Sequence, residues 1–212
     1  MRRLKELPDP NETRETYTDQ YAEFPRRNPV VERWHQYRAR SVIQKLESHF
    51  PSGCFVEVGF GPMRMLRYAV QNPHWSVVGI EYSEAAVANA VREGFDARHG
   101  DFTDARIEPG SVDVILACHV LEHMRTPGGW LDEARERLRP GGGLGLLVPS
   151  ETAWGRHVLG RIHPVYYVSS GWHLWGFSRT AIERLLISHG YALVHLREGR
   201  LYPEAFAVAK KA

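Results

Sequence analysis

The sequence has no excess of charge of one sign and no long apolar run. Its 27 lysine and arginine residues are nearly matched by 25 aspartate and glutamate residues, for a net charge of +2. This balance gives no global electrostatic reason to expect a nucleic-acid partner. No run approaches the roughly 20 apolar residues of a membrane helix, and the N-terminus lacks the apolar stretch of a secretory signal. We therefore expect a cytoplasmic protein with no nucleic-acid and no membrane partner.

The sequence also has few cysteines. Cys54 and Cys118 both fall in apolar runs that are typical of buried strands, so we expect free thiols in a reducing compartment, with no disulfide and no metal role. The length of 212 residues suits one hydrophobic core. We expect residues 1–27 to form a loose N-terminal arm and residues 28–212 to form a single domain, present as a monomer or a homodimer.

Short apolar strands alternate with helical segments along most of the chain. After a helix over residues 29–50, strands are expected at 54–58, 76–80, 95–99, 112–117 and 145–148. Parallel strands need long crossover connections, so this alternation predicts a doubly wound α/β sheet with helices on both faces. The last third predicts a helix at 178–188 and an antiparallel hairpin of strands at 191–196 and 205–209. The expected sheet is therefore seven-stranded and mostly parallel, with an antiparallel C-terminal hairpin.

Glycines and acidic residues stand where the predicted strands end, which is where open α/β sheets bind their ligands. The first strand runs into Glu57–Gly61, whose glycines permit a tight turn and a close approach of the backbone to a ligand. The second ends at Glu81, where a carboxylate can accept both hydroxyls of a ribose. The third is followed by Asp101 and Phe102, which suit an adenine amino group and ring face. A nucleoside-bearing cofactor is predicted.

Six segments, in order, resemble class I S-adenosylmethionine-dependent methyltransferases, in the branch that includes small-molecule and glycan methyltransferases. They are VEVGFG at 56–61, GIEYS at 79–83, HGDF at 99–102, SVDVILACHVLEHM at 111–124, LRPGGGLGLLVP at 138–149 and HLWGFS at 173–178. The resemblance covers nearly the whole chain from about Val31 onward. It implies a Rossmann-like methyltransferase fold and methyl transfer from S-adenosylmethionine to a small-molecule or glycan acceptor, with S-adenosylhomocysteine as product.

The resemblance also implies which residues contact the cofactor. They are Glu57, Gly59 and Gly61 at its amino acid end, Glu81 at its ribose hydroxyls, Asp101 and Phe102 at its adenine, and Cys118 and His119 near its sulfonium. Tyr82, next to Glu81, is also expected to contact the cofactor. In the N-terminal arm, Tyr17 and Tyr21 are expected to close over it. The chain departs from the family at Met63, where the glycine-rich loop often carries a third glycine.

The acceptor side needs a group that aligns the acceptor and removes a proton, and histidine suits that task at neutral pH. His119 follows the fourth strand. His173 lies near the end of a lid-like insertion at about 151–177 that is dense in aromatic residues and histidines. By resemblance, His173 is the first candidate for a base or acceptor ligand and His119 the second. We expect no metal, although His119 and His123 flank Glu122 at a spacing that resembles a metal-binding helix.

Three other functions stay open as alternatives. A regulatory pseudo-enzyme would keep the cofactor pocket and lack catalysis. An NAD-dependent oxidoreductase would use the same fold and ribose carboxylate, but the third glycine of its G-x-G-x-x-G fingerprint is replaced here by Arg64. A nucleic-acid methyltransferase is disfavoured, because the chain lacks the N/D-P-P-Y/F tetrad of amino-directed DNA enzymes and an obvious phosphate-binding stripe.

Overall fold

The computed structural model describes residues 1–3, 29–151, 173–199 and 203–212. The predicted N-terminal arm, with Tyr17 and Tyr21, therefore lies almost wholly outside the described residues, as does most of the insertion predicted at 151–177. Within the described ranges, no helix is both long enough and apolar enough to cross a membrane.

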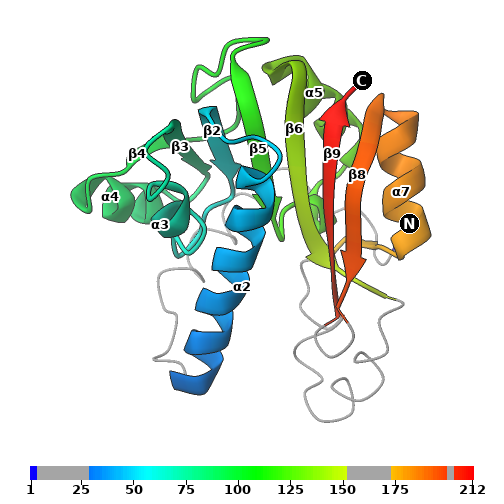
Figure 1. The fold of residues 1–212 in the computed structure, drawn as a ribbon, viewed down its shortest axis with the longest axis horizontal. Helices are drawn as coiled ribbons and strands as arrows, with labels where there is room; N and C mark the ends of the chain where they lie inside the picture. The colour runs from blue at the N-terminus through cyan, green and yellow to red at the C-terminus, as the bar shows by residue number, and fades with distance from the viewer. Residues whose placement is uncertain (4–28, 152–172, 200–202) are drawn as a thin grey trace. The chain divides into compact units, whose positions relative to one another are not determined.

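The described strands include a seven-stranded sheet in the order β4-β3-β2-β5-β6-β9-β8 (Figure 1). The strands are β2 (Gly53–Val58), β3 (Trp75–Glu81), β4 (Asp96–His99), β5 (Val112–Cys118), β6 (Leu138–Pro149), β8 (Tyr191–Glu198) and β9 (Glu204–Lys211). β2 pairs in parallel with β3, and β3 with β4, whereas β9 runs antiparallel to both β6 and β8. The predicted fold, a mostly parallel sheet with an antiparallel C-terminal hairpin, is confirmed.

Helical segments precede or connect these strands. They are α2 (Pro29–Glu47), α3 (Leu66–Ala69), α4 (Glu84–Arg92), the 3-10 turn η1 (Leu121–His123), α5 (Pro127–Arg137) and α7 (Arg179–Ser188). The start of α7 is fixed locally, because the hydroxyl of Ser178 accepts a hydrogen bond from the N–H of Ala181 at 3.2 Å. Ser83 caps α4 in the same way. A further short sheet pairs β1 (Arg2–Arg3) with β7 (Trp175–Gly176).

The strand β6 begins seven residues before the start that the sequence predicts. The pattern indicates a strand at 145–148, but β6 begins at Leu138 and runs through Gly141–Gly143. Glycine usually weakens a strand interior. The structure shows why glycine suits this place: a Cβ at Gly142 would lie 3.1 Å from the carbonyl oxygens of Val112 and Asp113, so a side chain there would require the neighbouring backbone to shift by a few tenths of an ångström.

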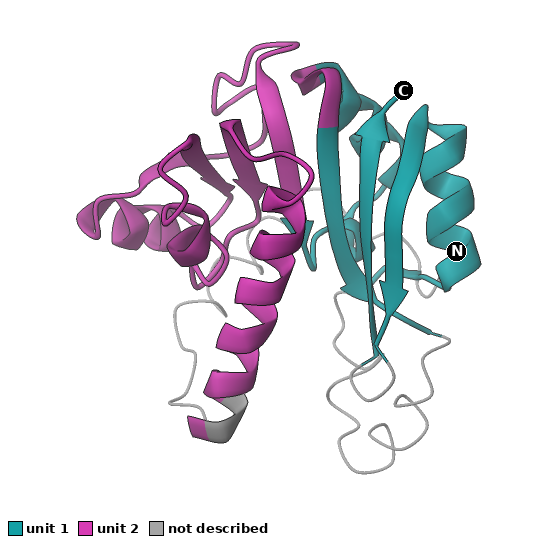
Figure 2. Ribbon diagram, in the orientation of Figure 1, with its two compact units in different colours: residues 1–7, 117–136, 143–212 teal, residues 8–116, 137–142 magenta. Residues whose placement is uncertain are grey.

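The described chain divides into two compact units, drawn in different colours in Figure 2. We call residues 8–116 and 137–142 the glycine-loop unit, and residues 1–7, 117–136 and 143–212 the histidine unit. In the glycine-loop unit, Phe55 stacks on Trp75 with ring centroids 4.8 Å apart. In the histidine unit, the buried Tyr191 donates its hydroxyl to the carbonyl of Leu131 at 2.9 Å. The single domain expected over residues 28–212 stays a prediction.

Candidate functional site

The loop after β2 is held against the end of β3. Gly59 and Gly61 have φ of 68° and 46°, in the left-handed region that glycine adopts without penalty. The N–H of Gly59 donates to the carbonyl of Ile80 at 2.8 Å. The N–H of Gly61 donates to the Glu81 carboxylate at 3.0 Å. The glycine loop and the acidic strand end, which the sequence predicts as parts of one site, are therefore in direct contact.

Glu81 organises the backbone around it. Its carboxylate also accepts the N–H groups of Tyr82 at 2.8 Å and Ser83 at 3.2 Å, and the residue is only 5% exposed. A carboxylate offers about four acceptor positions, so three backbone donors leave capacity for a ligand hydroxyl. Tyr82 is half-buried beside it, and its carbonyl oxygen lies 2.8 Å from Nε2 of His99.

Glu57 is a buried carboxylate directly before the loop. It is 1% exposed, and its Oε2 makes no hydrogen bond with any described residue. Burial raises the pKa of Glu57 well above its usual range, and the nearby charge of Glu81 adds to this, although a hydrogen bond from the N–H of Leu66 lowers it. A buried carboxylate with an unpartnered oxygen suits a cationic ligand group.

The third strand end carries Asp101 and Phe102. One carboxylate oxygen of Asp101 accepts the N–H groups of Thr103 at 2.8 Å and Asp104 at 3.0 Å, which closes the turn. The ring of Phe102 is packed inside the unit, with only 2% of the residue exposed. Their contacts with an adenine stay predictions.

Met63 occupies the position where a third glycine is common. Its φ of 57° is left-handed, which explains why glycine suits this place. The methionine side chain is 7% exposed and belongs to a core cluster with Phe60, Leu66 and Ala90. The left-handed backbone of Met63 costs on the order of 1 kcal/mol, and burial of its side chain contributes roughly 1.5–3 kcal/mol, so burial more than offsets the strain.

Gly79 of β3 packs closely against two side chains that follow β2. A Cβ added there would lie 2.7 Å from the Phe60 ring and 2.9 Å from a Leu66 methyl group. We expect Gly79→Ala to lower the free energy of unfolding by about 1–2 kcal/mol through overpacking, measured by urea denaturation. The exposed Ser76→Ala on the same strand is the control and should change it by less than about 0.5 kcal/mol. Equal stability of the two variants would contradict this account.

His119 lies in the histidine unit, directly after β5, whose last residue is the half-buried Cys118. It has a φ of 56°, which is uncommon for a residue other than glycine. Its Nδ1 is 3.1 Å from Oε1 of Glu122, and its Nε2 is 2.6 Å from Oε1 of Glu204. Both ring nitrogens are therefore engaged by carboxylates.

These contacts set the charge of His119. Burial lowers the pKa of His119, but the two carboxylates together outweigh it and raise the pKa to about 9. Burial raises the pKa of the Glu122 carboxyl, and the hydrogen bond from His119 with the charges of His123 and His173 turns the net shift downward. In this arrangement His119 is an imidazolium that donates from both nitrogens. It is suited to holding two carboxylates in place more than to accepting a proton.

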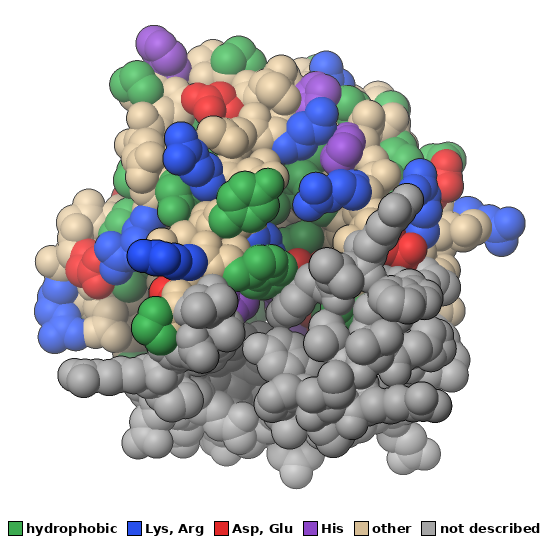
Figure 3. Space-filling view, turned by 60° about the horizontal axis from the view of Figure 1, so that its bottom comes forward, with side chains coloured by type: hydrophobic (Ala, Val, Ile, Leu, Met, Phe, Trp, Pro, Cys, Tyr) green, Lys and Arg blue, Asp and Glu red, His purple; other side chains and the backbone are tan. Residues whose placement is uncertain are grey.

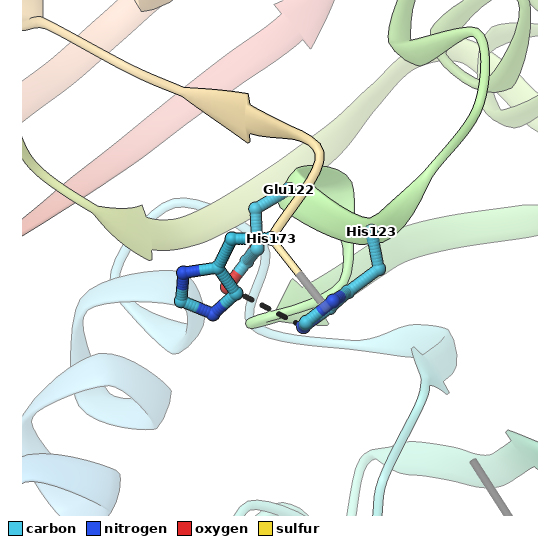
Figure 4. Close-up of side chains that lie close together, drawn as sticks. All are labelled: Glu122, His123 and His173. Atoms are coloured by element: carbon cyan, nitrogen blue, oxygen red, sulfur yellow. Dashed lines mark ion pairs between the residues drawn. The ribbon is translucent and has the colours of Figure 1, made fainter. Parts of the chain in front are cut away.

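His173 lies beside Glu122 and His123 (Figure 4). Two hydrogen bonds tie its segment to η1: the N–H of Leu174 donates to the carbonyl of Glu122 at 2.8 Å, and the indole N–H of Trp175 donates to the carbonyl of Met124 at 2.7 Å. The rings of His123 and His173 meet edge to face with centroids 5.0 Å apart. The structure thus brings both sequence-predicted acceptor-side histidines into contact with Glu122 or its immediate neighbours.

Neither carboxylate of this cluster is among the site residues predicted from the sequence, although Glu122 stands between His119 and His123 in the pattern described above. Glu122 is adjacent to His123 in the chain, so its position after β5 is a signal that could have found it. Glu204 gives no local signal, because it is 85 residues from His119 and reaches it only through the pairing of β9.

Charges of both signs lie on the face of the molecule drawn in Figure 3. On the face drawn in Figure 3, lysine and arginine side chains are interspersed with hydrophobic and acidic ones. In the glycine-loop unit, Arg67 pairs with Glu93 at 2.5 Å and Arg98 with Asp96 at 2.9 Å. Local pairing therefore neutralises part of the basic charge.

The chain is similar to known methyltransferases in sequence. A profile of the family described as a methyltransferase domain matches residues 31–196. A probable S-adenosylmethionine-dependent methyltransferase of Mycolicibacterium smegmatis is 38% identical over 77 residues, which cover 35% of this chain and 30% of that protein. An uncharacterized 37.1 kDa protein in a transposon of Streptomyces fradiae is 34% identical over 112 residues, which cover 49% of this chain and 31% of that protein. The chain thus spans about a third of the length of the curated relatives it matches.

Among solved structures, the magnesium protoporphyrin IX methyltransferase of Synechocystis, with bound S-adenosylhomocysteine, is similar with a TM-score of 0.71. The match covers 96% of this chain and all of that one, at 16% sequence identity. At that identity the likeness shows a shared fold and leaves the chemistry to be argued from the site.

Proposed function

We propose, because the chain belongs to the family of methyltransferase domains, that it transfers the methyl group of S-adenosylmethionine to a small-molecule or glycan acceptor. The observation that carries the proposal is Glu57, a buried carboxylate with an oxygen unpartnered among the described residues, directly before a glycine loop. S-adenosylmethionine presents a cationic ammonium group at its amino acid end. The pyrophosphate of a dinucleotide is anionic and would be repelled there.

The glycine-loop unit would hold the cofactor. Glu57 would bind the ammonium group, the backbone at Gly59 and Gly61 would approach the amino acid end, and Glu81 would accept the ribose hydroxyls. Asp101 would accept from the adenine amino group through Oδ2, because Oδ1 accepts the N–H groups of Thr103 and Asp104. The contacts predicted for Tyr82, Phe102, Cys118, His119, Tyr17 and Tyr21 belong to the same proposal. When bound, the cofactor supplies a methyl carbon already activated by its sulfonium.

The histidine unit would serve the acceptor. Its task is to align the attacking atom and to manage a proton. His119 has both ring nitrogens on carboxylates, so we assign it a positioning role toward Glu122. His173 is half-buried beside Glu122 and is the residue we place against the acceptor.

Calorimetric titration tests the proposal. The protein is titrated with S-adenosylhomocysteine and, in parallel, with NAD. We expect micromolar binding of S-adenosylhomocysteine and no heat from NAD. Production of S-adenosylhomocysteine from S-adenosylmethionine is then followed over a panel of small-molecule and glycan acceptors. Binding of NAD alone would contradict the proposal, and cofactor binding without turnover on any acceptor would favour the regulatory pseudo-enzyme.

A further inference from the structure

We propose that Glu122, His123 and His173 form a binding site for a divalent transition-metal ion of the zinc type. One carboxylate oxygen and one ring nitrogen of each histidine lie within 4.8 Å of one another. Figure 4 shows the three side chains converging from η1 and from the segment before β7. The proposal departs from the sequence expectation of no metal, which rested on spacings along the chain and could not place His173 beside η1.

An unpartnered buried atom supports the site independently. Glu122 is 0% exposed, and its Oε1 faces Nδ1 of His119 at 3.1 Å. Its Oε2 makes no hydrogen bond with any described residue. Leaving a buried acceptor in that state costs about 1–3 kcal/mol, and more when the group is charged. A cation bound to Oε2 would remove this cost, while Oε1 lies on Nδ1 of His119 and 3.9 Å from Nε2 of His123.

The surroundings hold the three ligands in place. His119 fixes one oxygen of Glu122 and is itself anchored on Glu204 at 2.6 Å, which is how outer partners orient the carboxylate of a metal site. The hydrogen bond from Leu174 to the Glu122 carbonyl holds His173 next to η1. The arrangement is therefore built from backbone and side-chain contacts that do not depend on an ion.

The donor set indicates the kind of ion. Two imidazole nitrogens and one carboxylate suit zinc and its first-row neighbours, whereas magnesium and calcium prefer oxygen ligands. Tetrahedral zinc, with bonds of about 2.0–2.1 Å, keeps its donor atoms about 3.4 Å apart. The donor atoms, which lie within 4.8 Å, would close by at most about 1.4 Å through side-chain rotation. Three protein ligands leave one position open, as in catalytic zinc sites.

The open coordination position would let the ion bind the oxygen of a methyl acceptor. This step rests on the proposed function. The ion would polarise a bound hydroxyl, whose proton leaves to water. The oxygen lone pair then forms the bond to the methyl carbon, while the electrons of the carbon–sulfur bond stay on sulfur and neutralise the sulfonium. Metal binding itself does not rest on methyl transfer.

Titration of the full, chelator-treated chain with Co²⁺ tests the site. We expect one ion per chain, seen as visible absorption bands that Zn²⁺ abolishes by competition and Mg²⁺ does not. His173→Ala and Glu122→Gln should each weaken Co²⁺ binding by roughly 100-fold or more, above the 10- to 100-fold that loss of an outer partner causes. His74→Ala, which removes an exposed histidine of the glycine-loop unit, is the control and should bind as wild type does.

Two readouts keep the test decisive. The urea midpoint and the S-adenosylhomocysteine affinity of each variant show whether the fold persists, so that loss of the metal site is distinguished from unfolding. If His173→Ala does not fold, Co²⁺ binding by Glu122→Gln tests the site. Absence of Co²⁺ binding by the wild type, or equal binding by both variants, would overturn the proposal. Because no acceptor or turnover is needed, this failure is distinct from failure of the proposed function, which S-adenosylhomocysteine binding reports.

Discussion

Replacing Glu81 by alanine is expected to weaken S-adenosylhomocysteine binding by roughly 30- to 150-fold, or about 2–3 kcal/mol. The carboxylate would accept hydrogen bonds from the ribose hydroxyls, and charge-assisted bonds of this kind are among the stronger ones in proteins. It also holds the N–H groups of Gly61, Tyr82 and Ser83, so its loss frees the glycine loop. Calorimetry on the purified variant measures the effect.

A matched variant separates this local effect from a general loss of negative charge. Glu84→Ala removes an exposed carboxylate from the first turn of α4, a few residues away, and should leave the affinity unchanged. The urea midpoints of both variants show whether the fold persists. Wild-type affinity in the folded Glu81→Ala protein would refute the assignment of Glu81 to the ribose.

The fold was largely predictable because short-range chemistry determines its elements. Buried β-branched runs identify β2, β3 and β5, and Ser178 caps the helix that the pattern places after it. The early start of β6 was not predictable, because only the approach of Gly142 to the carbonyls of β5 makes glycine favourable there.

The residues of the candidate site also fall into two groups: those that local sequence patterns predict and those that only contacts between distant segments bring together. Glu57 and Glu81 stand at strand ends, where the direction of a parallel sheet brings them together without knowledge of side-chain packing. The cluster around Glu122 depends on pairings between distant segments: Glu204 arrives on β9, and His173 is held by the hydrogen bond from Leu174. No spacing in the sequence encodes these contacts. The sequence therefore predicts that Glu57 and Glu81 lie near one another, but it does not predict the cluster around Glu122.

Glu57→Gln is expected to stabilise the ligand-free protein while weakening cofactor binding. Burial raises the pKa of Glu57 in the folded state above the usual value of 4.5. The contribution of Glu57 to the free energy of unfolding is therefore fully present below its unfolded-state pKa, and it is lost as pH rises toward its folded-state pKa. In that window the folded state binds one proton more than the unfolded state, so the free energy of unfolding falls by up to about 1.4 kcal/mol per pH unit.

Glutamine has nearly the same shape and no charge, so the variant should lack this part of the pH dependence. Urea denaturation of both ligand-free proteins between about pH 5 and about pH 8 should show curves that diverge in favour of the variant as pH rises. The same variant should bind S-adenosylhomocysteine roughly 10- to 150-fold more weakly, because a charged hydrogen bond to the ammonium group is lost. The exposed Glu84→Gln is the control for both measurements. A residue that holds a ligand is expected to behave in this way, because its charge lowers the stability of the ligand-free protein and strengthens binding. Parallel pH curves together with unchanged affinity would show that Glu57 is not part of the site.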